Sequence, residues 1–101
     1  MPTNPGERGI LILTSLAGGE KHGYALMQDI EGFAGVKLGP GTLYGALARL
    51  EEDGLVSALP ADQRRRPYRI TPEGSAVLEQ ELSHSAKIAR IGLRRLSAAA
   101  G

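Results

Sequence analysis

The residues best suited to chemistry in this sequence are arginines, three of which stand side by side at Arg64, Arg65 and Arg66. With Arg69 they occupy a stretch, residues 63–71, that contains no acid. Guanidinium groups bind phosphate oxygens through paired, charge-assisted hydrogen bonds, so this run favours a polyanionic partner, although it could also form a solvated loop. Because the net charge is only +1, such local patches say more about partners than the total charge does.

A second set of polar side chains lies in the stretch GPGTLYGALARLEEDGLV, residues 39–56. Thr42 and Tyr44 carry hydroxyls that can donate to phosphate, and Arg49 can bind guanine or phosphate through two parallel hydrogen bonds. Two of them have structural alternatives: Tyr44 could pack against the fold, and Arg49 could pair with Asp53 four residues later. We favour a binding role for Arg49 and leave Tyr44 open between binding and packing.

The chain lacks the side-chain sets that catalysis and metal binding require. It has no cysteine, no phosphate-loop motif and only two histidines, His22 and His84, without metal-ligand spacing. Ser83 and His84 are consecutive, so on a helix they point about 100° apart and make a poor nucleophile and base. We expect His22 to help start a helix rather than to bind a metal or sense pH. Neither enzymatic activity nor a cofactor is expected.

The composition predicts one small domain with an aliphatic core. The 101 residues are 42 % hydrophobic, yet they include one Phe, three Tyr and no Trp. A thin core of this kind often gains stability from a second chain. The lack of cysteine fits a reducing compartment, and the sequence has neither a signal peptide nor a run of about 20 apolar residues. We therefore expect a cytoplasmic protein without a membrane segment.

Hydrophobic periodicity predicts three short helices in the first half of the chain. Residues 1–6, rich in Pro and Asn, are typical of a flexible arm. Helices are expected over residues 7–16, 23–33 and 40–53. Their buried faces are expected to be formed by Leu26, Ile30 and Phe33 in the second helix, and by Leu43, Leu47 and Leu50 in the third.

A hairpin is expected after the third helix. Pro40 suits the first position of that helix, and Gly54 suits a left-handed residue that ends it. Residues 55–59 and 67–71 are short and strand-like, and the second of them alternates apolar and polar side chains. The polar loop between them, residues 60–66, would place the three arginines at the tip.

A fourth helix is expected from Pro72 to about Leu96, with Thr71 as its N-cap. It carries two offset apolar stripes, which indicates two packing partners: the body of the domain and a second copy of the chain. Its cations, Lys87, Arg90, Arg94 and Arg95, are expected on the wet face. The residues predicted to form the dimer interface are Leu82, Ile88, Ala89, Ile91, Leu93 and Leu96.

The predicted fold is mainly α (α+β): a winged helix-turn-helix of three helices and a two-stranded β-wing, plus a C-terminal dimerisation helix. The expected division is an arm over 1–6, a DNA-binding domain over 7–71, and a dimerisation helix with its tail over 72–101. In such folds the third helix enters the DNA major groove. The predicted DNA contacts are Gly41, Thr42, Tyr44, Gly45, Arg49, Arg64, Arg65 and Arg66. Tyr24 is a less favoured contact, because we expect it mainly to pack in the core or against a helix.

Three motifs resemble the PadR family of bacterial transcription regulators. Residues 22–26, HGYAL, resemble the HGY motif that opens the family's second helix. Residues 40–56, PGTLYGALARLEEDGLV, are similar to its PGTLY and LE.DGL signature, and residues 68–74, YRITPEG, to its wing exit. Two departures stand out, because Gly39 replaces a frequent serine and the chain has no tryptophan to build a stacked ligand platform.

The resemblance implies a homodimeric, repressor-type regulator that binds a pseudo-palindromic DNA operator. It also implies that a small hydrophobic or aromatic effector could release the DNA, since some members of the family respond in this way. The rival interpretation is a winged helix that binds proteins rather than DNA. Salt would separate the two, because binding to several phosphates weakens steeply as salt rises and apolar docking does not.

Overall fold

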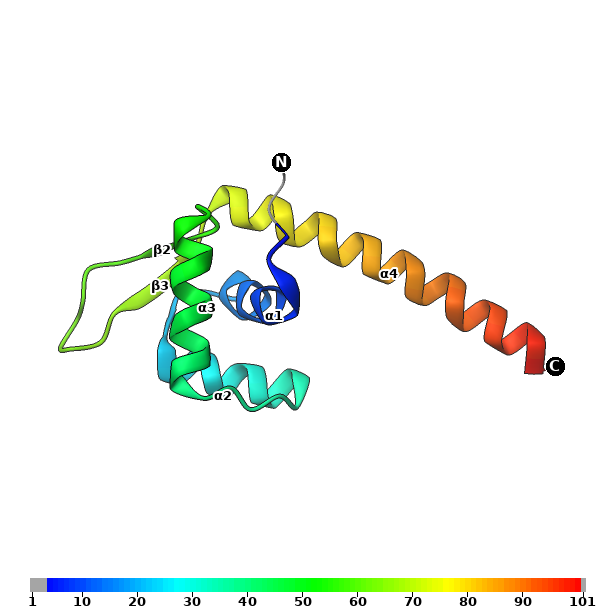
Figure 1. Ribbon diagram of the computed structural model, residues 1–101, viewed down its shortest axis with the longest axis horizontal. Helices are drawn as coiled ribbons and strands as arrows, with labels where there is room; N and C mark the ends of the chain where they lie inside the picture. The colour runs from blue at the N-terminus through cyan, green and yellow to red at the C-terminus, as the bar shows by residue number, and fades with distance from the viewer. Residues whose placement is uncertain (1–3, 101) are drawn as a thin grey trace.

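The computed structural model describes residues 4–100, which form four helices and three short strands. The first three helices and the sheet make up a body, and the last helix leaves it as a long arm (Figure 1). The molecule measures 58 × 30 × 21 Å, with the arm along its longest dimension. The elements are α1 (Gly6–Ala17), β1 (Lys21–His22), α2 (Gly23–Ala34), α3 (Pro40–Glu52), β2 (Val56–Ala58), β3 (Pro67–Ile70) and α4 (Pro72–Ala100).

The body is held by an aliphatic core, as the composition predicts. α1 lies at its centre and packs against α2, α3, α4 and β3. The buried hydrophobic side chains are Ile12, Leu13, Leu16, Leu26, Ile30, Leu38, Leu43, Leu47, Leu50, Leu55, Val56 and Leu78. The three leucines predicted for α3 are among them, but the prediction for Phe33 is wrong, because its side chain is 49 % exposed. No residue of α2 after Ile30 is buried, so the last turn extends beyond the core.

The predicted helix starts are close to the observed ones. α1 begins at Gly6, one residue early, and Asn4 Oδ1 accepts a hydrogen bond from Gly6 N at 3.0 Å. Of the arm expected over 1–6, residues 1–3 lie outside the described residues. Pro40 occupies the first turn of α3, and Gly54 is left-handed with φ 77°, as expected. Thr71 caps α4 by accepting a hydrogen bond from Gly74 N at 3.0 Å.

The sheet has the order β1-β3-β2 with antiparallel pairing throughout. The predicted hairpin is present, with shorter strands in which Val56 pairs with Ile70 and Ala58 with Tyr68. β1 was not predicted, because a strand of two residues has no periodicity to detect. His22 precedes α2 as its N-cap but makes no capping bond with its side chain. Its backbone instead pairs with Pro67, which joins the start of α2 to the wing.

The base of the wing is joined to both neighbouring helices by hydrogen bonds. Thr71 Oγ1 donates to the Gly54 carbonyl at 2.7 Å, and Thr71 N donates to the Leu55 carbonyl at 3.1 Å. Leu55 N in turn donates to the Leu50 carbonyl at 2.9 Å. The end of α3, the wing and the start of α4 therefore form one connected unit.

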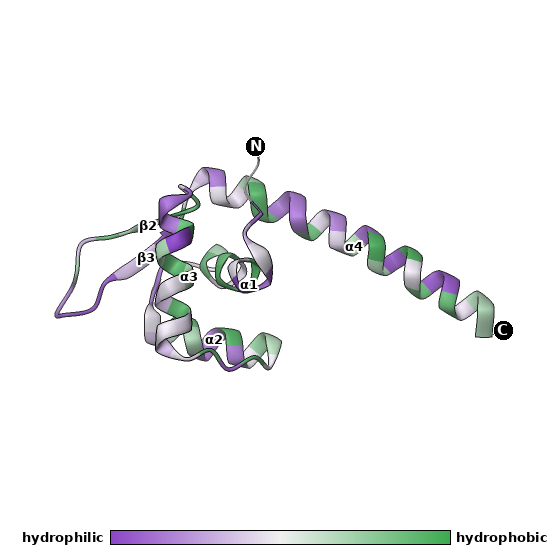
Figure 2. Cartoon of the chain, viewed as in Figure 1, coloured by the Kyte–Doolittle hydropathy of each residue, from purple (hydrophilic) through white to green (hydrophobic). Residues whose placement is uncertain are grey.

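α4 runs four residues past its predicted end, to Ala100. Its first turns belong to the body, since Leu78 is buried and Val77 packs on the core. Beyond this point hydrophobic and hydrophilic residues alternate along the arm (Figure 2). Within residues 4–100, no helix combines the length and apolar character needed to cross a membrane.

Candidate nucleic-acid interface

The outward face of α3 is nearly bare of side chains. Leu43 and Leu47 point into the core, while Gly41, Gly45 and Ala48 are exposed, as the helical spacing predicts. A Cβ atom added at Gly41 or Gly45 would meet no atom of the protein within 4 Å. Nothing in the described fold thus requires glycine at these two positions. Small residues there keep the helix backbone open to an external surface.

Some other glycines of the body, by contrast, lie close against the protein itself. A Cβ at Gly9 would come within 2.8 Å of the Pro5 side chain, and one at Gly74 within 2.9 Å of Ile70. A Cβ at Gly23 would lie 2.7 Å from Cζ of Tyr44. The phenol of Tyr44 therefore packs over the start of α2, and the side chain is still 48 % exposed.

The two tyrosines considered for DNA contact differ in position. Tyr44 combines packing against α2 with a half-exposed ring, so both of its predicted roles stay compatible with the structure. Tyr24 was expected mainly to pack, and this is wrong, because its side chain is 62 % exposed. Its hydroxyl accepts a hydrogen bond from Gln28 Nε2 at 3.0 Å. Tyr24 lies at the first turn of α2, where the chain leaves it open to solvent.

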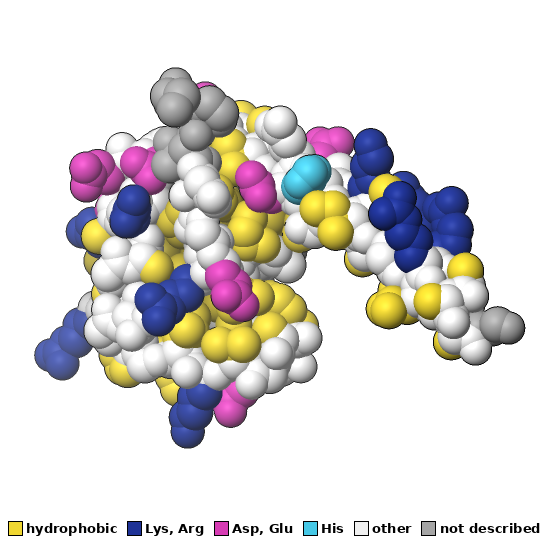
Figure 3. Space-filling model, turned by 45° about the vertical axis from the view of Figure 1, so that its right-hand side comes forward, with side chains coloured by type: hydrophobic (Ala, Val, Ile, Leu, Met, Phe, Trp, Pro, Cys, Tyr) yellow, Lys and Arg dark blue, Asp and Glu magenta, His cyan; other side chains and the backbone are white. Residues whose placement is uncertain are grey.

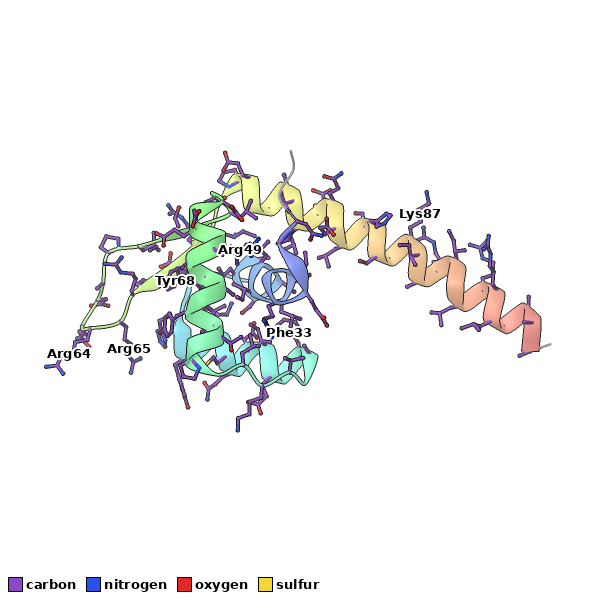
Figure 4. All side chains as sticks on the ribbon, viewed as in Figure 1. Phe33, Arg49, Arg64, Arg65, Tyr68 and Lys87 are labelled. Atoms are coloured by element: carbon purple, nitrogen blue, oxygen red, sulfur yellow. The ribbon has the colours of Figure 1, made fainter. Side chains whose placement is uncertain are left out.

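Arg49 and Thr42 line one groove beside α3, together with Gly41 and Gly45. The groove has a volume of about 740 Å³, and its opposite wall is the start of α1, including Glu7. Arg49 is exposed and lies on the side of α3 that faces α1 (Figure 4). The guanidinium and the hydroxyl predicted to touch DNA thus border the same opening.

The start of α1 was not expected to be near α3 at all. Arg8 lines the groove with Arg49, and no local pattern in the sequence relates residues so far apart along the chain. The proximity comes from packing, since a Cβ at Gly9 would lie 3.3 Å from Leu50 Cδ2. Gly9 is the one sequence signal available, because a glycine inside a helical stretch permits close approach of a second helix.

The wing ends in a tight turn that displays the arginines. Asp62 N donates to the Arg65 carbonyl at 2.7 Å, and Arg65 N donates back to the Asp62 carbonyl at 2.9 Å. The two residues between them, Gln63 and Arg64, have φ values of 50° and 76°. Two-residue hairpin turns need this left-handed backbone and favour Asn-Gly, so Gln63 and Arg64 adopt it at a cost of about 1–2 kcal/mol each.

The three wing arginines do not share one environment. Arg64 stands at the outermost point of the tip and points into solvent (Figure 4). Arg65 Nη1 lies 3.3 Å from His22 Nε2, and because a guanidinium only donates, the imidazole nitrogen accepts. This contact holds the wing loop toward β1. Arg66 is exposed like its neighbours.

Acidic groups gather at the opposite end of α3. Glu51 and Glu52 are exposed in its last turn. Burial raises the pKa of the Tyr68 phenol, and the negative charge of Glu51 raises it further. The acidic end of α3 therefore lies beside the base of the wing, at the far end of the helix from Gly41 and Thr42. This arrangement favours contact with an anion through the first half of α3.

The residues predicted for dimerisation lie along the arm, and the structure leaves the larger ones exposed. The exposed fractions are 42 % for Leu82, 58 % for Ile88, 68 % for Leu93 and 69 % for Leu96. Ala89 is also exposed, and Ile91 is half-buried. Apolar side chains gather on one side of the arm and cations on another (Figure 3). Within residues 4–100, no group of His, Asp and Glu is placed to hold a metal ion.

Comparison with known proteins identifies the family to which the chain belongs. Residues 12–80 match the transcriptional regulator PadR-like family. The chain belongs to the PadR-like family. It has the winged-helix DNA-binding fold of these transcriptional regulators, as predicted, and the family is one of regulators rather than enzymes.

Two relatives share much of this sequence. Transcriptional regulator Rv3488 from Mycobacterium tuberculosis is 41 % identical over 96 residues, which cover 89 % of this chain and 86 % of that protein. An uncharacterized 37.1 kDa protein in transposon Tn4556 of Streptomyces fradiae is 47 % identical over 88 residues. That alignment covers 87 % of this chain but only 25 % of the longer protein.

A solved structure agrees with the fold. A PadR family transcription regulator from hypervirulent Clostridium difficile R20291 superposes with a TM-score of 0.81 at 26 % identity. The superposition covers 90 % of this chain and 99 % of that one, so it extends beyond the winged-helix body into α4.

Proposed function

We propose that this PadR-like protein binds DNA sequence-specifically and regulates transcription as a homodimeric repressor. The observation that carries the proposal is the outward face of α3, where glycines without any internal packing role leave the backbone open. A helix can then lie deep in a major groove, with Thr42 and Arg49 at base edges or phosphates. The protein would act in the bacterial cytoplasm, where the chromosome is.

The wing supplies the second half of the DNA contact. Its tip and α3 lie on the same side of the body (Figure 1), so a duplex on α3 comes within reach of Arg64. The narrow two-residue turn suits entry into a minor groove or contact with its phosphates. Tyr44 and Tyr24 are both open to solvent around the start of α2, and in this proposal their hydroxyls donate to the DNA backbone nearby.

A second copy of the chain is the partner that best fits the arm. Its apolar side chains are too exposed for a helix that stays alone in water, and an identical arm offers a matching surface. A two-fold dimer would present two α3 helices to a pseudo-palindromic operator, with half-sites about 34 Å apart. A small hydrophobic or aromatic effector that changes how the arms pack would release the DNA.

The test is binding to DNA upstream of the protein's own gene, or to sequences selected from a random pool, followed by fluorescence anisotropy at several salt concentrations. We expect affinity that survives random competitor DNA and falls steeply with salt. Arg49→Ala and Arg64→Gly should both weaken it. Arg94→Gln, on the arm, is the control for lost charge and should leave affinity unchanged.

Two results would contradict the proposal. Binding that ignores salt would indicate apolar docking to a protein instead, as the rival interpretation requires. Equal binding by Arg49→Ala and the parent chain would remove α3 from the interface. Arg64→Gly separates charge from strain, since glycine relieves the left-handed turn and stabilises the wing while it removes the cation.

A further inference from the structure

Two grooves meet at the start of α3. The first is the groove shared by Thr42, Arg49 and Arg8. The second, of about 310 Å³, lies between the start of α1 and the loop ahead of α3, and Lys37 lines it. Arg8 and Thr42 border both grooves. The surface around the first turn of α3 is therefore continuous from Lys37 to Arg49.

This surface gathers cations from three separate elements. Arg8 comes from α1, Lys37 from the α2–α3 loop and Arg49 from α3, and all three side chains are exposed. One acid, Glu7, lines both grooves, while Asp53 lines only the first, near the far end of α3. Thr42 and Asp53 are eleven residues apart, or about 16 Å along the helix. Around the first turn of α3 the cations thus outnumber the acids.

The position of this surface relative to the wing indicates which part of a bound DNA duplex it would face. The wing extends from one side of α3, and α1 lies on the other side (Figure 1). A major groove about 12 Å wide is bounded by two phosphate backbones, so a helix inside it has one backbone on each flank. The wing arginines can reach only the backbone on their own side. The flank toward α1 needs a different set of cations.

We propose that Arg8 and Lys37 hold the phosphate backbone on the α1 flank of α3. This inference rests on the proposed DNA binding and adds a contact that neither the recognition helix nor the wing provides. The two side chains bind phosphate and read no base, so they set the register of α3 in the groove without choosing the sequence. Glu7, between them, opposes the contact and limits its strength.

The test compares the double variant Arg8→Gln/Lys37→Gln with the double variant Lys87→Gln/Arg90→Gln in the full chain. Both remove two exposed cations, but the second pair lies on the α4 arm. Salt-dependent anisotropy should show a log–log slope reduced by about 1 for each groove side chain in each bound copy. The ratio of specific to random-DNA affinity should stay the same, and the arm variant should match the parent protein.

The variant Glu7→Gln should change the DNA affinity in the opposite direction. Removing this acid should strengthen DNA binding, whereas a surface that DNA never approaches would show no change. Thermal unfolding of each variant checks that the fold is retained. If the parent protein binds DNA and Arg8→Gln/Lys37→Gln keeps its salt slope, this inference is wrong while the proposed function stands. If the parent protein does not bind DNA, both are overturned.

Discussion

Leucine side chains are buried in the body but exposed in the arm. Leu26 and Leu43 in the body are completely buried, whereas Leu93 and Leu96 in the arm are more than two-thirds exposed. Fully burying a leucine stabilises a fold by about 1.5–3 kcal/mol, and the arm leaves this gain unused within one chain. The body thus buries its own leucines, while the arm leaves apolar surface exposed, as the proposed dimer requires.

The glycines of the body also differ in their surroundings, because some pack against the protein itself and others face open space. Gly9 and Gly74 lie against the Pro5 ring and the Leu55 carbonyl, which would collide with a Cβ atom, whereas Gly41 and Gly45 face open space. Because no neighbour within the chain limits the size of the residues at positions 41 and 45, a binding partner can limit it instead. The outer face of α3, like the arm, is therefore a surface that the described fold leaves open to the proposed partners.

The largest difference in stability should come from shortening a leucine to alanine in the body and, for comparison, in the arm. Leu26→Ala should lower the free energy of unfolding by about 2–5 kcal/mol, because it leaves a cavity in the core. Leu93→Ala should change it by less than about 0.5 kcal/mol at a protein concentration low enough to keep the chain monomeric. Urea unfolding at low concentration measures both, and equal losses would refute the contrast.

Charge on the apolar side of the arm should abolish association. Leu93→Asp/Leu96→Asp would bury carboxylates in a dimer interface, so we expect dimer affinity to fall at least about 100-fold, or about 2.7 kcal/mol. Sedimentation equilibrium measures this, with Arg90→Gln on another side of the helix as the control. A double variant that still sedimented as a dimer would place the interface elsewhere.

A methyl group added to either kind of glycine should give results of opposite sign. Gly45→Ala should stabilise the fold by about 0.5–1 kcal/mol, because alanine favours helix and the site is open. Gly74→Ala should destabilise it by about 1–3 kcal/mol, because its methyl group would collide with the backbone carbonyl of Leu55, which cannot move aside as a side-chain tip can. Thermal unfolding provides both values.

DNA binding provides a second measurement on the Gly45→Ala variant. Gly45→Ala should weaken DNA binding despite its greater stability, since the methyl group separates the helix backbone from the groove. If Gly45→Ala bound DNA as well as the parent protein does, close approach of α3 would be excluded.

The smallest effect concerns pH at the base of the wing. The pKa of Tyr68 is raised, first by burial and then by Glu51. An unfolded tyrosine ionises near pH 10. The folded state keeps its proton to higher pH, so the stability it contributes is complete below about pH 10 and is lost as pH rises through the folded value. Tyr68→Phe should show a shallower loss of melting temperature between pH 9 and 11, in ~0.5-unit steps, than the parent protein.

Much of the body could be predicted from the sequence, because its signals are local. Pro40 and Gly54 mark the ends of α3 by backbone chemistry alone, and Thr71 marks the start of α4. The three leucines of α3 follow the helical period, so its buried and open faces were assigned correctly. The hairpin was also found, because alternation at Tyr68 and Ile70 is a local pattern.

What the sequence did not reveal depends on packing between distant segments. β1 is too short for periodicity and exists only because β3 pairs with it. Phe33 follows the correct face of α2, but the core ends before reaching it. The contact of Tyr44 with Gly23 and the position of Arg8 beside α3 arise from tertiary packing that no local spacing encodes.

The most direct single measurement is DNA binding as a function of half-site spacing. Operators selected from a random pool would be tested by anisotropy with the two halves moved apart by five or ten base pairs. Two α3 helices on one dimer predict that five extra base pairs, half a helical turn, abolish tight binding, because the halves then face opposite sides of the duplex. Binding that does not depend on spacing, or no selection of any symmetrical site, would contradict a dimer that reads DNA through α3.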